Sequence, residues 1–130
     1  HIGPTGHGQL AKMANQICIA GIVQGLAEAL HFVTRAGVDP TRVIDAIGQG
    51  AAGSWQMTNR AATMIEGRYD FGFAVDWMVK DLAYTLEQAD AIGARLELTE
   101  LVARFYREVQ EAGGNRWDTS GLLTRLTDVG

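Results

Sequence analysis

Cysteine and proline are scarce in this sequence, which holds one cysteine and two prolines in 130 residues. A single cysteine excludes an internal disulfide and is typical of a reducing compartment, so we expect a cytoplasmic protein. Cys18 lies in an apolar run with no base beside it, and we expect it to fill the core rather than act as a nucleophile. Pro4 and Pro40 leave long stretches free to form helices.

Lysine is also scarce: only Lys12 and Lys80 accompany nine arginines. The difference matters for chemistry, because a lysine ammonium can give up a proton whereas a guanidinium stays charged. The formal net charge is −4, so the surface as a whole is not expected to attract phosphate backbones. We therefore expect no nucleic-acid partner.

Long uninterrupted apolar runs are absent, since none reaches the roughly 18–20 residues of a membrane span. The stretch 17–33 comes nearest, and Gln24, Glu28 and His31 interrupt it at helical spacing. The start of the chain has no signal-peptide pattern, and we expect no membrane association. Because the first residue is His1 rather than methionine, we expect an excised domain or the remaining part of a longer protein.

The apolar residues of the sequence recur at the spacing of α-helices. No run alternates between apolar and polar residues with the period of two that strands show. Asp39 before Pro40, and Ser54 before Trp55, are typical helix starts. We predict a single all-α domain over residues 1–130, with helices over about 9–36, 40–48, 55–66, 74–92, from after Thr99 to before Gly113, and 119–126.

The first predicted helix is apolar on nearly every side, too apolar for the surface of a monomer. It should be wrapped by other helices or by a second subunit. Gly21 and Gly25, four residues apart, would let another helix approach closely.

A glycine-rich segment, residues 3–8, precedes this helix and resembles a phosphate-binding loop only superficially. A dinucleotide fingerprint requires a strand before it, and a Walker loop requires Gly-Lys-Ser/Thr. Neither is present, so a tight turn into the helix is the favoured interpretation.

Lys12 has two amides on its own helix face, Asn15 at i+3 and Gln16 at i+4. Burying such groups is costly without partners, and a cation near a helix N-terminus opposes the helix dipole. The cluster is therefore predicted to be a site. Lys80 has a simpler interpretation, as half of an exposed pair with Asp76 four residues before it. The histidines have no metal-ligand spacing, so no metal is expected.

The segment 3–16, GPTGHGQLAKMANQ, resembles the G-x-x-G-x-G-x-x-x-K-x-x-N-[NQ] signature of the β-hydroxyacid dehydrogenases, which include 3-hydroxyisobutyrate dehydrogenase and tartronate semialdehyde reductase. The later Gly72-Phe73 and Lys80-Asp81-Leu82 resemble the family's second motif. The resemblance covers essentially the whole chain. It implies the family's C-terminal helical domain, whose fold is like the C-terminal domain of 6-phosphogluconate dehydrogenase.

The resemblance also implies residue roles. Lys12 would be the catalytic acid/base, and Lys80 would contact NAD or NADP near the nicotinamide ribose. Four residues would bind substrate or line its site: Asn15, Gln16, Phe73 and Asp81. Many members have asparagine where this chain has Gln16.

The family's dinucleotide-binding Rossmann domain would lie before this chain, so we expect these 130 residues alone to be inactive. The expected partners are a small hydroxyacid or its semialdehyde, and further copies in a homodimer or homotetramer formed through the long helix. The competing hypothesis is a non-enzymatic helical self-association module.

Overall fold

The computed structural model describes residues 3–127, and within them it is helical with no strand. This confirms the all-α prediction. Two backbone segments meet in one isolated bridge, between Ala74 and Asp118. The elements in order are α1 (His7–Arg35), α2 (Pro40–Ile47), α3 (Trp55–Glu66), α4 (Val75–Ile92), α5 (Glu97–Val109), the π-helical turn η1 (Gln110–Gly114), the 3₁₀-helix η2 (Thr119–Leu123) and α6 (Thr124–Thr127).

Helices α2 and α3 begin where their capping residues predict. The Asp39 side chain accepts a hydrogen bond from the Thr41 amide at 3.0 Å, and Pro40 occupies the first turn of α2. The Ser54 hydroxyl accepts from the Met57 amide at 3.0 Å. Each cap satisfies a backbone donor that has no partner inside its helix, and local sequence is sufficient to specify it.

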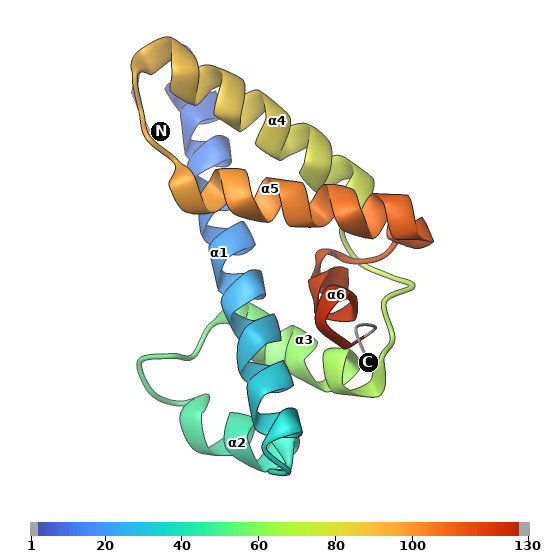
Figure 1. Cartoon of the computed structure of the whole chain (residues 1–130). Coiled ribbons are helices and arrows are strands. Elements are labelled where there is room, and N and C mark those ends of the chain that lie inside the picture. Colours follow the sequence, from blue (N-terminus) through green and yellow to red (C-terminus); the bar gives the residue numbers. More distant parts are fainter. Residues whose placement is uncertain (1–2, 128–130) are drawn as a thin grey trace.

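The long helix α1 is the axis of the fold (Figure 1). Helices α4 and α5 cross it toward its N-terminal end, while α2 and α3 lie toward its C-terminal end. The buried residues of α1 recur at helical spacing: Ala20, Val23, Gln24, Leu26, Ala27 and Leu30. They join α3, α4, α5 and η2 in one core.

Only part of α1 is enclosed, which corrects two expectations. No residue of α1 before Ala20 is buried, and Lys12 is exposed rather than buried. Cys18 is also exposed, so its prediction as core filler is wrong. The physical reason is that α4 and α5 cover one side of α1 and leave the side bearing Cys18 open.

By length and composition alone, α1 could cross a membrane, and 33% of its most apolar 18-residue window is buried here. Core helices of soluble proteins pass the same test. Close approach to α1 occurs at Gly21, where an added Cβ would lie 3.3 Å from Leu98 Cδ2. Nothing within 4 Å would meet a Cβ at Gly25.

The start of α5 differs from prediction by three residues. It begins at Glu97 rather than after Thr99, and Thr99 is buried inside the helix. Glu97 and Glu100 in the first turn favour this start through the helix dipole. The predicted last helix over 119–126 is divided into η2 and α6.

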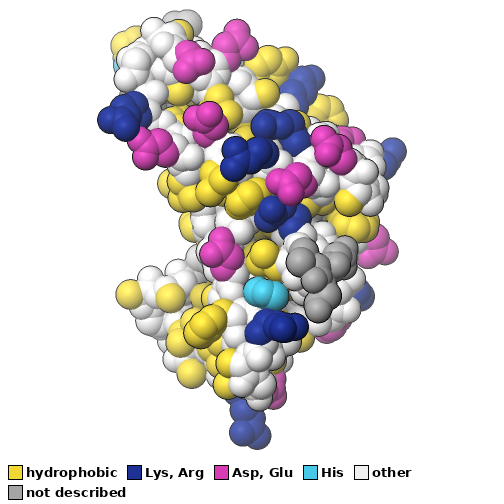
Figure 2. Space-filling view, viewed as in Figure 1, with side chains coloured by type: hydrophobic (Ala, Val, Ile, Leu, Met, Phe, Trp, Pro, Cys, Tyr) yellow, Lys and Arg dark blue, Asp and Glu magenta, His cyan; other side chains and the backbone are white. Residues whose placement is uncertain are grey.

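Figure 2 shows charged side chains of both signs intermixed over α4 and α5, with hydrophobic side chains gathered toward α2. Neither sign forms a continuous patch on this face.

Candidate functional site

A pocket of about 610 Å³ lies between the first turns of α1 and the middle of α4. Five of the six predicted site residues line it: Lys12, Asn15, Gln16, Phe73 and Asp81. Lys12, Asn15 and Gln16 come from one face of α1, as their spacing predicts. Phe73 and Asp81 come from the connector before α4 and from α4 itself, so tertiary packing assembles the group.

A chain of hydrogen bonds joins the two helices across this pocket. The Gln16 amide donates from Nε2 to Asp81 Oδ2 at 2.9 Å, and the Asn15 amide donates from Nδ2 to Gln16 Oε1 at 3.2 Å. Asp81 therefore fixes which end of the Gln16 amide faces α4. The glutamine side chain has one more methylene than asparagine, which extends its amide from α1 toward Asp81 on α4.

Lys12 faces the pocket without a partner of its own. Within residues 3–127 its ammonium makes no hydrogen bond or ion pair, and the side chain is exposed. An amine that is not engaged in a salt bridge keeps all its donor capacity for a ligand. The glycine-rich segment before it forms the tight entry to α1, with φ of +97° at Gly6.

Tyr84 and Thr85 of α4 also line the pocket, and sequence reasoning missed both. They follow Asp81 by three and four positions, so helical spacing could have identified both. Thr85 is buried and its hydroxyl donates to the Asp81 carbonyl at 2.8 Å.

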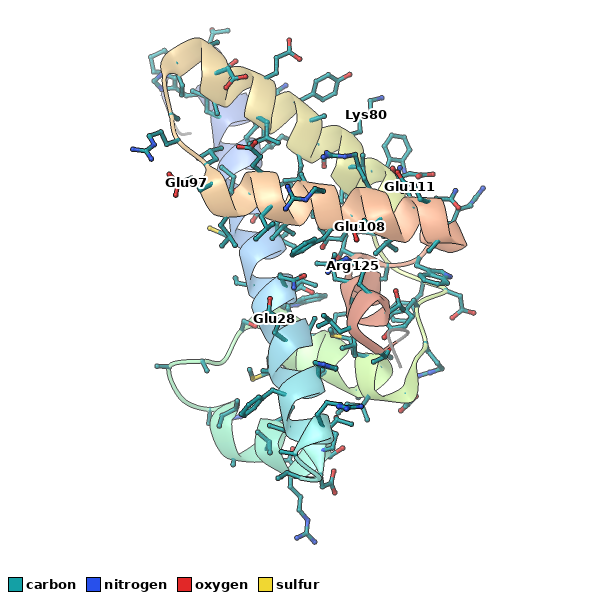
Figure 3. The ribbon with its side chains drawn as sticks, viewed as in Figure 1. Glu28, Lys80, Glu97, Glu108, Glu111 and Arg125 are labelled. Atoms are coloured by element: carbon teal, nitrogen blue, oxygen red, sulfur yellow. The ribbon has the colours of Figure 1, made fainter. Side chains whose placement is uncertain are left out.

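Lys80 is the one predicted residue outside the pocket. It lies on the outer side of α4 and points away from α1 (Figure 3), with its Nζ 5.6 Å from the centroid of the Trp77 ring. The predicted pair with Asp76 is wrong. Asp76 instead accepts hydrogen bonds from Gln110 at 2.8 Å and Asn115 at 3.1 Å, and these bonds lower the pKa of its carboxyl group.

The arrangement supplies one exchangeable proton and several amide donors. Each pocket amide has two N–H groups and uses one of them inside the protein, so Asn15 and Gln16 retain one N–H each. Together with the Lys12 ammonium these groups suit a small anionic ligand such as a carboxylate. Within residues 3–127 no three His, Cys, Asp or Glu side chains are grouped as metal ligands.

Comparison with known proteins relates the chain to a family. Residues 6–126 match the family described as the NAD-binding domain of NADP-dependent 3-hydroxyisobutyrate dehydrogenase. The chain belongs to this family. The resemblance recognised in the two sequence motifs is thereby confirmed, and relatives of the 3-hydroxyisobutyrate dehydrogenase family match nearly the whole chain.

One relative, an uncharacterised oxidoreductase of Shewanella frigidimarina, is 61% identical over 96% of the chain and 43% of its own length. The 2-hydroxy-3-oxopropionate reductase of Escherichia coli is 34% identical, again over 96% of the chain and 43% of its own length. The crystal structure of a 3-hydroxyisobutyrate dehydrogenase from Salmonella typhimurium superposes with a TM-score of 0.81 at 28% identity, over 89% of this chain and 41% of that one. The chain thus spans less than half the length of these relatives.

Proposed function

We propose that the chain is the helical domain of an NAD(P)-dependent oxidoreductase that interconverts a small 3-hydroxyacid and its semialdehyde. The observation that carries the proposal is the pocket that gathers Lys12, Asn15, Gln16 and Asp81 from two helices. The family match and the similarity to named hydroxyacid enzymes support it. The relatives' additional length supports a nucleotide-binding domain that precedes the chain, and the 130 residues alone are then expected to show no turnover.

Lys12 is proposed to exchange the proton of the substrate oxygen. During oxidation its free amine accepts the hydroxyl proton, and during reduction its ammonium returns that proton to the carbonyl oxygen. Its exposure in the pocket, without a salt bridge, leaves the group available for this exchange. Arginine could not replace it, because guanidinium does not give up its proton.

The amides of Asn15 and Gln16 are proposed to bind the substrate's carboxylate or hydroxyl. Asp81 holds the Gln16 amide so that its remaining N–H direction is fixed. Phe73 would contribute an apolar wall. Orientation of the substrate against Lys12 then depends on side chains held from both helices.

The family match supports an NAD or NADP cofactor. Lys80 is proposed to contact the dinucleotide near the nicotinamide ribose from outside the pocket, because it is exposed and lies next to Asp81 in the chain. When bound, the cofactor supplies or takes up the hydride. The choice between NAD and NADP is proposed to rest with the nucleotide-binding domain, which would bind most of the cofactor.

The test is to replace Lys12 with alanine and with arginine in the polypeptide that carries this chain together with its nucleotide-binding domain. Both variants should lower kcat for reduction of small semialdehydes by about 10²–10⁴-fold, the range expected for loss of a general acid. The matched control is Lys80→Ala, which should mainly raise KM for the dinucleotide. Activity of Lys12→Ala within a few-fold of the parent would contradict the proposed role.

Self-association through α1 is the second proposal, and one observation favours it. An exposed apolar stripe runs along the helix at spacings of three, four and seven residues: Ala14, Cys18, Ile22, Gly25 and Phe32. Phe32 is 73% exposed, and a stripe of this length is costly to leave in water. We propose a homodimer or homotetramer in which a second copy covers it.

The stripe is tested by Ile22→Glu, with Ile92→Glu at the exposed end of α4 as the matched control. Sedimentation should show dissociation for the first variant and the parent assembly for the second. A monomeric parent would refute self-association. Loss of assembly with unchanged turnover would separate the self-association module from the catalytic site.

We propose the cytoplasm as the compartment, supported by the lone unpaired thiol of Cys18, which is exposed. Cell fractionation with detection of the protein in membrane or exported fractions would contradict this.

A further inference from the structure

The segment that precedes η2 holds a buried carboxylate that sequence reasoning did not single out. Asp118 is 1% exposed and accepts hydrogen bonds on both oxygens. Its Oδ2 accepts from the Ser120 amide at 3.0 Å, from the Ser120 hydroxyl, and from Arg60 Nε at 3.0 Å. Its Oδ1 accepts from the Phe73 amide at 3.0 Å.

Arg60 is itself restrained by neighbouring groups. Its guanidinium carbon lies 5.0 Å from the ring centroid of Trp55 and 5.1 Å from that of Phe71. These ring contacts, and the hydrogen bond from Arg60 Nη1 to the Asn59 carbonyl at 3.2 Å, restrain the guanidinium. The ion pair therefore anchors the carboxylate as well as neutralising it.

The connector before α4 passes directly against this carboxylate. At Gly72 the backbone has φ of +72°, and an added Cβ would lie 2.1 Å from Asp118 Oδ1. Both the backbone angle and the close approach require glycine there.

Two backbone hydrogen bonds hold the same connector on either side of Phe73. The Asp118 amide donates to the Tyr69 carbonyl at 2.8 Å, and the Val75 amide donates to the Trp117 carbonyl at 2.8 Å. The bond from the Phe73 amide to Asp118 lies between them. The C-terminal segment thus fixes the connector at three places.

Phe73 depends on this anchoring more than a core residue would. Its side chain is 39% exposed and lines the pocket with Lys12. It lies outside α4, so no helical hydrogen bonds set its backbone. The bond to Asp118 fixes the backbone from which the ring projects.

We propose that Asp118 is a positioning residue for substrate binding, acting through the Phe73 backbone to place the Phe73 ring at the pocket. The inference rests on the proposed function of this pocket. A purely structural role, as cap of η2 and partner of Arg60, would affect stability without acting through Phe73. The two roles differ in which oxygen of the carboxylate matters.

Asp118→Asn separates the two oxygens. Asparagine has one oxygen for four donors, and three of these converge on Oδ2. Its amide nitrogen would then face the Phe73 N–H, and that bond would be lost. Ser120→Ala is the matched control, because it removes one donor from Oδ2 and leaves Oδ1 unchanged.

The experiment is a double-mutant cycle of Asp118→Asn and Phe73→Ala in the polypeptide with its nucleotide-binding domain. Asp118→Asn should raise KM for the semialdehyde about tenfold with kcat within about threefold, the scale of a displaced pocket side chain. In the Phe73→Ala background it should have no further effect on KM. KM for the dinucleotide, and all constants of Ser120→Ala, should stay at parent values.

An unchanged KM, or the same rise in KM in both backgrounds, would overturn the inference. Should Asp118→Asn fail to fold, Arg60→Gln removes the ion pair that anchors the Asp118 carboxylate and should raise KM in the same way. A failure of Arg60→Gln to alter KM would also count against the inference.

Amide hydrogen exchange in the 130-residue chain distinguishes failure of the inference about Asp118 from failure of the proposed function. Phe73 should lose protection in Asp118→Asn and keep it in Ser120→Ala. Retained protection in Asp118→Asn overturns the inference alone. A parent enzyme without semialdehyde activity overturns the proposed function, and the substrate-positioning role with it.

Discussion

The two stretches of α1 have similar apolar compositions but different surroundings. Residues 20–35 include six buried side chains, whereas residues 7–19 include none. Helices α3 and α5 and the 3₁₀-helix η2 enclose residues 20–35 in the core. Residues 7–19 meet α4 through polar groups, as in the bond from Gln16 to Asp81.

This difference shows that apolar character alone does not decide which part of a helix is buried. The stretch 20–35 supplies stability, because its neighbours exclude water from it. The stretch 7–19 lines the pocket and has no buried side chain. Substitutions of the same residue type in both stretches should therefore have unequal effects on stability.

The largest difference should appear between Leu30→Ala and Leu10→Ala. Leu30 is 2% exposed and Leu10 is 39% exposed. Removing the buried side chain should lower the free energy of unfolding by about 2–5 kcal/mol, through lost burial and a residual cavity. Leu10→Ala should change it by about 0.5 kcal/mol or less.

Urea unfolding of the 130-residue chain, followed by circular dichroism, measures both values. Equal losses for the two leucines would refute the division of α1 into an enclosed and an open stretch.

A smaller difference should separate Tyr106→Phe from Tyr84→Phe. Tyr106 is fully buried and donates to the Thr119 carbonyl at 3.2 Å, whereas Tyr84 is 54% exposed at the pocket. Losing the buried hydrogen bond should cost about 1 kcal/mol or somewhat more. Tyr84→Phe should leave the free energy of unfolding nearly unchanged, and a matching loss there would contradict the comparison.

Alkaline pH offers a second measurement on the same pair. Burial raises the pKa of Tyr106 above its ordinary value of 10.0. The unfolded chain therefore ionises at lower pH than the folded one, and stability is fully present below pH 10 and declines above it. Unfolding at increasing pH should show this decline in the parent and a weaker one in Tyr106→Phe.

The smallest effect should come from Asp76, an exposed residue at the start of α4. Hydrogen bonds from Gln110 and Asn115 lower its pKa below the ordinary 3.8. Its contribution to stability is therefore present above pH 3.8 and is lost as pH falls through the lower folded value. Asp76→Asn should reduce the acid sensitivity of unfolding slightly, and an unchanged pH profile would contradict this role.

Helix positions could be predicted where a local signal was sufficient. The caps at Asp39 and Ser54 set α2 and α3, because each cap and its partner amide lie within three residues. The start of α5 was missed, since Thr99 has the chemistry of a cap but is buried by its tertiary neighbours.

The candidate site could likewise be predicted only where its residues lie close together in the sequence. Helical spacing alone placed Lys12, Asn15 and Gln16 on one face. A place for Asp81 in the site was implied only by the family resemblance. The bonds from Asp118 to Phe73 and Arg60 carried no local signal, because these partners lie 45 and 58 residues away. The mistaken pair of Lys80 and Asp76 arose because helical spacing ignores donors from another element, here Gln110 and Asn115.

The sequence by itself determined the helical class of this protein, two of its helix starts and the cluster on the first turns of α1. These depend on hydrogen bonds and periodicities within a few residues of chain. Only the tertiary structure decided which stretch of α1 is enclosed, which carboxylate orients Gln16 and which one holds the Phe73 backbone. Those choices depend on close packing of segments far apart in sequence, and neither the composition nor the spacing of one helix specifies its neighbours.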